Sequence, residues 1–326
     1  MKEWVGVVGK YNRPDIRKSI WQIVNSLGPY LLLWYVMYRS LSVSYLLTLA
    51  LSILAAGFLV RIFIIFHDCG HGSFFRSSRA NRIVGTLLGS LVFTPYEFWT
   101  NDHAMHHRTV GNLDKRGWGD IWTVTTEEYK QMSRPRRFRY RLYRHPVILF
   151  LIGPFIFFVL FYRIPRKKMN KKERQGIHLT NLIILIWCAS MILLMGWKAF
   201  LLIQLPVIYF ATTAGAWLFY IQHQFDQVIW ARSADWDYQQ MALEGSSYVK
   251  FPRILQWFSG NIGFHHIHHL SPKIPNYNLE KCQKENDLFQ QIKPMKFVES
   301  LKTMRFRLWD EESRKLITFR HYREAY

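Results

Sequence analysis

Histidines dominate the chemistry that this sequence can perform. Ten of the thirteen histidines lie beside long apolar segments, nine of them in three short clusters. The clusters read His67-Asp-Cys-Gly-His71, His103-Ala-Met-His106-His107 and His265-His266-Ile-His268-His269, and the tenth residue is His223. Residues three and four positions apart project from one face of a helix. Each cluster therefore presents two or three imidazoles on one side.

The number of imidazoles predicts more than one metal ion. The third cluster repeats the i, i+3, i+4 spacing of the second. Eight or nine converging imidazoles exceed what a single ion can use, so we expect a pair of metals. His266 falls off the shared face and is expected to be a neighbour rather than a ligand. Neutral imidazole suits iron, zinc and copper, so the residues alone leave the metal open.

Polar residues near the clusters are candidates for a supporting shell. Asp68 and Asp102 stand next to cluster histidines and are expected to orient imidazole rings by accepting their N–H groups. Asp114 and Asp120, in the turn-like segment after the second cluster, are weaker candidates for the same role. Asn261, just before the third cluster, is a candidate for holding a metal-bound water. Surface or helix-capping roles are the alternative for all of them.

Long apolar runs predict a membrane protein. Four runs of the 326-residue chain are expected to cross a bilayer. They are 20–38, 44–66, 179–195 and 199–221, and the helix of the second is expected to continue through His71. Two further runs, 83–99 and 146–162, are interrupted by glycine and proline. We expect these two to lie in or dip into the membrane interface.

The clusters and the charges predict the same topology. Ligands must meet on one side of the membrane, so an even number of crossings must separate the clusters. The excess of 43 basic over 22 acidic residues lies largely in the links, with six arginines in 134–144 and seven basic residues in 163–174. Such links favour the cytoplasmic side. Nucleic-acid binding, another use of such charge, would leave the apolar runs without a role.

These observations predict an all-α integral membrane protein with a single domain over 1–326. Four transmembrane helices and some interfacial helices would carry a cytosolic helical cap, formed by 67–178 and 222–326, that holds a histidine-ligated di-metal centre. Both termini would be cytoplasmic. The three cysteines are far apart in the sequence and predict neither a disulfide framework nor a cysteine metal site.

A metal pair at a membrane surface indicates a lipid-chain substrate. Acid–base groups cannot cleave an inert hydrocarbon C–H bond, whereas a redox-active metal that activates oxygen can. The sequence lacks motif context for a Ser/His/Asp nucleophile and has no Gly-rich phosphate loop. It also lacks the Glu-x-x-His pairs of soluble di-iron bundles.

The three clusters resemble the histidine boxes of the membrane fatty acid desaturases. The residue sequence of the first box, His-Asp-Cys-Gly-His, is typical of the acyl-lipid branch. Three further stretches, 111–117, 244–248 and 260–275, are similar to Bacillus-type acyl-lipid desaturases, notably the Δ5 enzyme. The resemblance covers most of the chain from about residue 20. It implies a centre of two Fe ions that uses O2 and two electrons to introduce a cis double bond into a saturated acyl chain of a membrane phospholipid.

The resemblance also implies the ligands and the partners. Carried over by position, the ligands are His67, His71, His103, His106, His107, His265, His268 and His269, and His223 matches an additional histidine of many members. The implied fold is a mushroom-like helical assembly in the cell membrane. The His-Pro-Gly-Gly motif of a fused cytochrome b5 is absent. Electrons are then expected from an external ferredoxin or flavodoxin that docks on the basic face.

Two other functions stay open at this point. A related di-iron membrane hydroxylase or alkane monooxygenase would use the same ligands and yield a hydroxyl product. A non-enzymatic metal-binding or haem-binding membrane protein is the other alternative. Bis-histidine haem would require histidines deep within facing spans, and none of the clusters lies in the middle of a predicted span.

Overall fold

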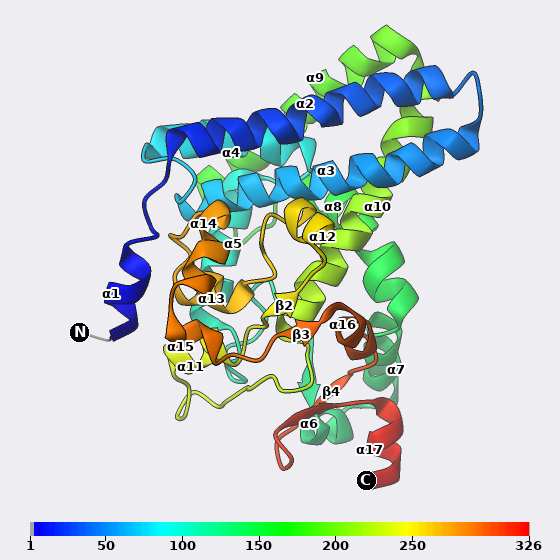
Figure 1. Cartoon of the computed structure of the whole chain (residues 1–326). Helices are drawn as coiled ribbons and strands as arrows, with labels where there is room; N and C mark the ends of the chain where they lie inside the picture. Colours follow the sequence, from blue (N-terminus) through cyan, green and yellow to red (C-terminus); the bar gives the residue numbers. More distant parts are fainter. Residues whose placement is uncertain (1–2, 326) are drawn as a thin grey trace.

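The computed structural model of the chain describes residues 3–325 and is mainly helical (Figure 1). The helices are α1 (Glu3–Gly9), α2 (Ile16–Ser40), α3 (Tyr45–His71), α4 (Ser78–Leu91), α5 (Tyr96–Thr109), α6 (Thr126–Gln131), α7 (Arg134–Tyr143), the π-helix η1 (Val147–Ile152), α8 (Gly153–Val159), the 3₁₀-helix η2 (Phe161–Arg163), α9 (Lys171–Met195), α10 (Trp197–His223), α11 (Tyr238–Leu243), α12 (Arg253–Phe258), α13 (His265–Leu270), α14 (Asn276–Lys284), α15 (Asp287–Gln290), α16 (Phe297–Thr303) and α17 (Phe319–Ala325). The strands are β1 (Val124–Thr125), β2 (Val249–Lys250), β3 (Met295–Lys296), β4 (Leu308–Asp310) and β5 (Lys315–Ile317).

Four long helices coincide with the four predicted spans. Helices α2 and α3 run side by side as a hairpin, and a tight turn at Gly196, whose φ is +81°, joins α9 to α10 (Figure 1). Among the residues described, α3, α9 and α10 are long and apolar enough to cross a membrane. The protein therefore has the long apolar helices of a membrane protein.

Helix α2 is long enough to cross but does not belong to that set. Polar residues explain the difference, because its buried face includes Gln22 and Ser26. The Gln22 amide donates to Asn276 Oδ1 at 2.8 Å, and Ser26 Oγ accepts a hydrogen bond from Arg61 Nε at 3.2 Å. These bonds tie α2 to α3 and to the start of α14. The count of four spans remains a prediction.

The two interrupted apolar runs form short or bent helices. The first is divided between α4 and α5 by a break at residues 92–95, which contains Pro95. With 14 residues, α4 is only about 21 Å long, less than the hydrocarbon core of a bilayer. In the second run, η1 gives way to α8 at Gly153. The segment from Val147 to Arg163 is bent by 58° against α7, so this pair is either a broken span or a re-entrant loop.

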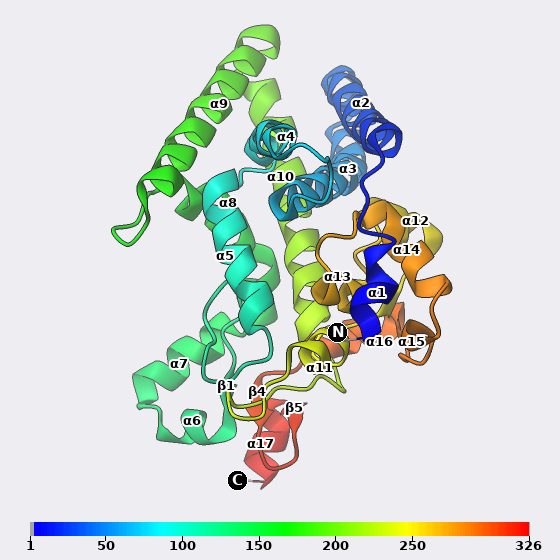
Figure 2. The same ribbon diagram turned by 90° about the vertical axis from the view of Figure 1, so that its left-hand side faces the viewer.

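The remaining elements pack around the ends of the long helices (Figure 2). One small sheet has the order β1-β4-β5, with β1 and β4 parallel and β4 and β5 antiparallel. The other pairs β2 with β3 in parallel, Val249 opposite Met295. The largest apolar core lies among α2, α3, α10 and the helices against them, and a second core lies under α13 and α14.

Candidate metal centre

Helix ends bring the histidine clusters together. Helix α3 continues to His71, as predicted, and ends because Gly72 adopts a left-handed conformation with φ of +64°. The second cluster lies on α5, the third forms most of α13, and α10 ends at His223. The four helices come from distant parts of the sequence. The histidine-bearing ends of α3, α5 and α10 meet α13 at one place.

The nine predicted ligand histidines fall into two groups, in each of which the candidate ligand atoms lie within 4.8 Å of one another. The first group is His67, His71, His103, His107 and His268, and the second is His106, His223, His265 and His269. Helices α5 and α13 each contribute to both groups. His103 and His107 of α5 join the first group, whereas the equivalent pair of α13, His265 and His269, joins the second. The arrangement therefore has room for two ions, not one.

Nitrogen–nitrogen distances fit ligands that share an ion. In the first group, His103 Nε2 lies 3.1 Å from His67 Nε2 and 3.2 Å from His107 Nε2. In the second, His223 Nε2 lies 3.1 Å from His106 Nε2 and 3.0 Å from His265 Nε2. Imidazole nitrogens this close together would suit ligands of a shared ion, because each would bind that ion at about 2.1 Å.

The partners of two rings in the second group favour a cation between those rings. Asp120 Oδ1 lies 2.8 Å from His106 Nδ1, and the Gly245 carbonyl oxygen lies 3.4 Å from His223 Nδ1. Each acceptor favours a proton on the Nδ1 atom that it faces, so both Nε2 atoms are left with lone pairs. Those lone pairs face each other at 3.1 Å. A metal ion between them would turn this repulsion into two bonds.

Burial keeps the imidazoles in the form that binds metals. Burial, and after it the neighbouring imidazoles, hold the pKa of His103, His107 and His265 well below the usual histidine value. The same causes lower the pKa of His268 and His269. These rings are neutral at pH 7 and offer lone pairs. In the described chain His269 has both ring nitrogens buried without a hydrogen-bond partner, which a metal ion would supply.

Two carboxylates contact cluster histidines. Asp68 Oδ1 lies 3.3 Å from His67 Nδ1, and Asp68 Oδ2 accepts hydrogen bonds from the backbone N and side-chain Nδ2 of Asn276, at 2.7 and 2.8 Å. Asp120 faces His106, as described above. Each carboxylate would fix one ring and increase its basicity as a ligand. Thus one carboxylate supports each group.

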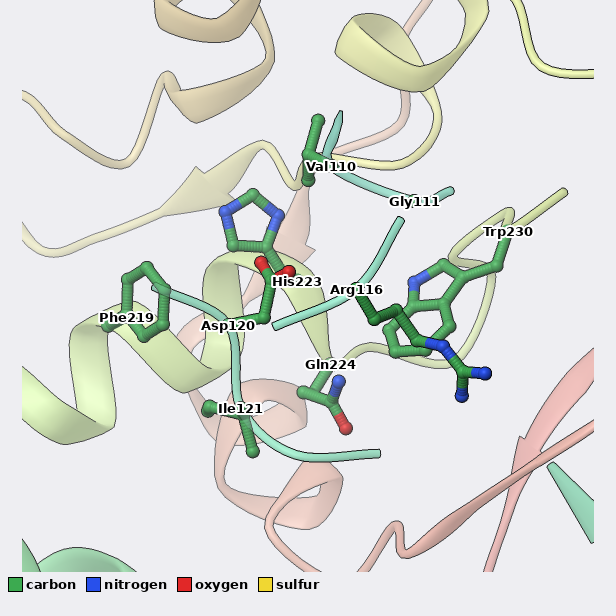
Figure 3. A pocket seen from close by; sticks show the side chains of 9 residues that line it. All are labelled: Val110, Gly111, Arg116, Asp120, Ile121, Phe219, His223, Gln224 and Trp230. Atoms are coloured by element: carbon green, nitrogen blue, oxygen red, sulfur yellow. The ribbon is translucent and has the colours of Figure 1, made fainter. Parts of the chain in front are cut away.

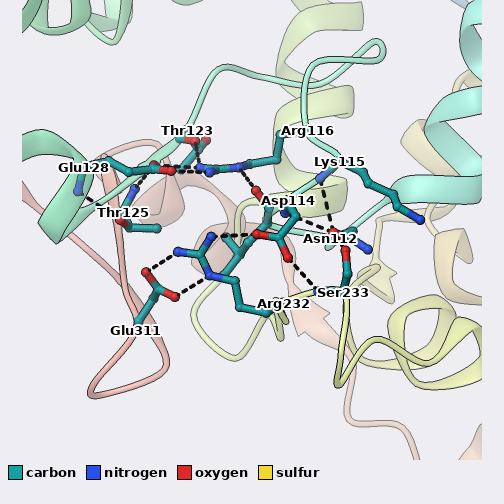
Figure 4. Close-up of polar contacts among 11 residues, drawn as sticks. Asn112, Asp114, Lys115, Arg116, Thr123, Thr125, Glu128, Arg232, Ser233 and Glu311 are labelled. Carbon is teal, nitrogen blue, oxygen red and sulfur yellow. Dashed lines mark hydrogen bonds and ion pairs between the residues drawn. The ribbon is translucent and has the colours of Figure 1, made fainter.

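The other polar candidates lie differently. Between residues 3 and 325, Asp102 makes no hydrogen bond with a histidine, and burial raises its pKa. Asp114 accepts hydrogen bonds from Arg232 Nη1 at 2.7 Å and from the Ser233 backbone N–H (Figure 4). The Asn261 amide bonds with Gln256 and with the carbonyl of Asn276, not with a histidine.

The Asp114 contacts nevertheless help to position the second group. Arg232 also pairs with Glu311, and Arg116 binds Glu128 through both of its terminal nitrogens (Figure 4). These ion pairs fasten both ends of the segment that carries Asp120. The carboxylate is therefore held against His106 by a fixed loop.

A small cavity borders the second group. It has a volume of about 20 Å³, enough for one water molecule. Asp120 and His223 line it, with Gln224 and Arg116 as further polar walls (Figure 3). The cavity would let a solvent molecule approach the carboxylate that supports His106.

Sequence reasoning missed Asn276. It bonds Asp68 through two nitrogens and exchanges hydrogen bonds with Gln22 of α2, so it connects the first group to a long helix. Asn276 is 208 positions from Asp68, and no local pattern marks it. Its place seven residues after His269 was the only available signal.

Comparisons with known proteins show the family of this chain. The fatty acid desaturase family model matches residues 42–295. The chain is 46% identical over 319 residues to a fatty acid desaturase of Bacillus subtilis (strain 168), and the match covers 98% of this chain and 91% of that relative. It is 30% identical over 237 residues to a chloroplastic omega-3 fatty acid desaturase of Brassica napus, covering 67% of this chain and 55% of the relative.

A cyanobacterial relative carries a more detailed name. The chain is 28% identical over 233 residues to an sn-1 acyl-lipid omega-3 desaturase (ferredoxin) of Nostoc sp. (strain 36), covering 68% of this chain and 62% of the relative. The chain thus spans under two thirds of the length of the plant and cyanobacterial proteins, but most of the Bacillus one. The family match covers both histidine groups. The chain belongs to the fatty acid desaturase family, whose members are oxidoreductases.

Proposed function

We propose that this protein is a membrane acyl-lipid desaturase. It would use O2 and two external electrons to introduce a cis double bond into a saturated acyl chain of a membrane phospholipid. The observation that carries the proposal is the pair of buried histidine groups at the ends of long apolar helices. The acyl-lipid name of the Nostoc relative supports the substrate class. The Δ5 position rests on the resemblance to Bacillus-type enzymes alone.

We propose two Fe ions as the cofactor, one in each histidine group. When bound, the iron pair would supply the oxygen activation that removal of hydrogen from a C–H bond requires. The chain's own residues hold the rings. Asp68 and Asp120 keep the Nδ1 protons of His67 and His106, so the Nε2 atoms stay available. Burial of seven of the nine rings would keep bulk water away from the reaction.

The location follows from the charges. Helices α3 and α10 end at the histidine groups, and the basic segments 134–144 and 163–174 are expected on the same side of the membrane as those groups. We propose that the site faces the cytoplasm at the inner surface of the cell membrane. The substrate chain would then reach the site from the lipid.

We propose that the electrons come from a ferredoxin or a flavodoxin. The names of several relatives include ferredoxin. Exposed Arg166, Lys167 and Lys168 precede α9, and Glu173 of α9 accepts a hydrogen bond from Asn101 of α5 at 2.9 Å. An acidic donor bound to this basic segment would lie beside the helix that carries three of the histidines.

Expression in a bacterium that lacks the expected unsaturated fatty acids, together with a competent donor, tests the proposal. Gas chromatography of the fatty acids should show new monounsaturated chains, and derivatisation locates the double bond. Unchanged lipids would contradict the desaturase. A hydroxylated chain would instead identify the related hydroxylase.

Variants in each group test the ligand assignment. His106→Ala and His268→Ala should each abolish activity and lower the bound iron from about two ions per chain to about one, since each removes one imidazole from the set that holds an ion. Membrane insertion should not change. The exposed His321 provides the control, because His321→Ala should keep both ions. Full activity in either cluster variant would refute the assignment.

A further inference from the structure

Two short helices follow the two strands of the small parallel sheet. Strand β2 leads into α12, and β3 leads into α16. Since the strands are parallel and paired, both helices begin at the same edge of the sheet. We call the exposed side chains of α12 and α16, with the groove beside α16, the α12–α16 surface.

The α12–α16 surface is attached to a candidate span. The Arg61 guanidinium of α3 stacks over the Trp257 ring at 3.9 Å and donates to the Trp257 carbonyl. Phe58 of α3 makes edge contacts with the rings of Trp257 and Phe258, with centroids 5.7 and 5.1 Å apart. Arg61 precedes His71 by ten residues, about 15 Å along the helix. Helix α12 therefore lies beside this candidate span.

Large apolar side chains of this surface are exposed. Ile254 of α12 and Val298 of α16 are 66% and 63% exposed. Trp257 and Leu301 are also exposed. Apolar side chains with cations around them are typical of helices that lie in a membrane interface. Contact with lipid would remove these side chains from water.

The charge of the surface is almost entirely positive. Segments 249–258 and 295–305 contain five cations and one carboxylate, that of Glu299. The cations are Lys250, Arg253, Lys296, Lys302 and Arg305. None of the five forms an ion pair with a carboxylate within the part of the chain that the structure describes. The surface is therefore complementary to an anion.

A groove beside α16 combines both properties. It is open, has a volume of about 410 Å³, and is lined by apolar residues and three cations. The lining residues are Pro146, Val298, Leu301, Lys302, Met304, Arg305 and Arg307. Arg307 is only 9% exposed, and its Nη1 donates to the carbonyls of Met304 and Phe306. A buried guanidinium at the groove, with flexible cations at its rim, suits a phosphate group.

We propose that the α12–α16 surface binds the headgroup of an anionic phospholipid of the surrounding leaflet. The lipid phosphate contacts Lys302, Arg305 and Arg307, and the glycerol and first methylenes cover Val298 and Leu301. This binding site is separate from the histidine groups and goes beyond the proposed desaturation. It requires neither metal nor electron donor.

Native mass spectrometry of the full-length protein in neutral detergent tests the proposal. Dihexanoyl phosphatidylglycerol and dihexanoyl phosphatidylcholine are the two probes. The anionic lipid should bind more tightly. The double variant Lys302→Gln with Arg305→Gln should weaken that binding about 30-fold, or about fivefold for each cation removed near a lipid surface. Equal binding of the two lipids to the unaltered protein would overturn the proposal.

A matched control separates this surface from general charge. Arg314→Gln with Lys315→Gln removes two exposed cations at the β4–β5 turn and should leave binding unchanged. An equal loss in this control would refute the assignment. Val298→Ser with Leu301→Ser should weaken the anionic lipid about tenfold and leave inorganic phosphate unaffected. Inorganic phosphate that binds as tightly as the lipid would show a free-anion site instead. Circular dichroism verifies that each variant is folded.

Discussion

The contact between Asp120 and His106 gives a sharp prediction about the second histidine group. Asp120 Oδ1 lies 2.8 Å from His106 Nδ1, and its other oxygen accepts a hydrogen bond from the Gly117 N–H at 3.3 Å. Asp120→Ala removes the acceptor and the charge. Asp120→Asn removes the charge but retains an oxygen that can accept the His106 proton. The two variants therefore separate orientation of the ring from electrostatic support.

The size of the effect follows from the kind of hydrogen bond. A hydrogen bond to a charged group contributes about 1.5–3 kcal/mol. The Asp120 side chain is 20% exposed, so solvent weakens the interaction and we take the lower part of this range. Asp120→Ala should then lower the metal affinity of the second group about 10- to 30-fold, at about 1.4 kcal/mol for each factor of ten. Asp120→Asn should have a smaller effect, because the orienting bond remains.

Metal retention during dialysis against graded chelator concentrations measures this affinity. The alanine variant should release about one ion per chain at a lower chelator concentration than the unaltered protein, and the other ion should stay. Glu127→Gln is the control, since that exposed carboxylate accepts a hydrogen bond from Gln131 of its own helix. Equal retention in the alanine variant and the unaltered protein would refute the role of Asp120. Simultaneous loss of both ions would refute the division into two groups.

Three further predictions concern packing, the buried network and the metal. Gly85→Ala would place a Cβ against the Tyr96 ring, whose hydroxyl donates to the Cys69 carbonyl at 2.8 Å. This substitution should lower the free energy of unfolding by about 1–3 kcal/mol. Thermal unfolding should show no such loss for the control Gly215→Ala, where the added methyl group meets open space. Asn276→Leu should destabilise the fold by about 1–3 kcal/mol, because it removes a donor from the buried Asp68 carboxylate. During chelator titration this variant should release metal from the first group before the second. Metal release identical to that of the unaltered protein would contradict this. Removal of metal by a chelator should lower the melting temperature, and Fe²⁺ should restore it, because an ion that binds only the folded state stabilises that state; a melting temperature that does not respond would speak against a built metal centre.

Much of the architecture could be predicted because its signals are local. Helical spacing placed the histidines of each cluster on one face, and apolar runs predicted the positions of the four long helices. The continuation of α3 through His71 could be read from the sequence because Gly72 follows at once. The convergence of the clusters could be predicted because their imidazoles outnumber the ligands of one ion and because ligands must meet on one side of the membrane.

The sequence favoured Asp102 over Asp120 as a supporting residue, whereas in the structure it is Asp120 that contacts His106. Asp102 and Asp120 are both near the second cluster, but only the fold of the loop decides which one faces His106. Asn276 reaches Asp68 across more than two hundred positions, so no spacing rule applies. The buried polar residues of α2 are also explained only by tertiary contacts, because Gln22 has its hydrogen-bond partner in α14 rather than in its own helix. Long-range polar pairs of this kind are set by the fold, not by periodicity.

The sharing of α5 and α13 between the two histidine groups has a consequence for how the two groups are spaced. His103 and His107 serve one group and His106 the other, all within five consecutive residues of a single rigid helix. The distance between the two groups along α5 is therefore set by the geometry of an α-helix rather than by the conformation of a loop. A tilt of α5 would move histidines of both groups together.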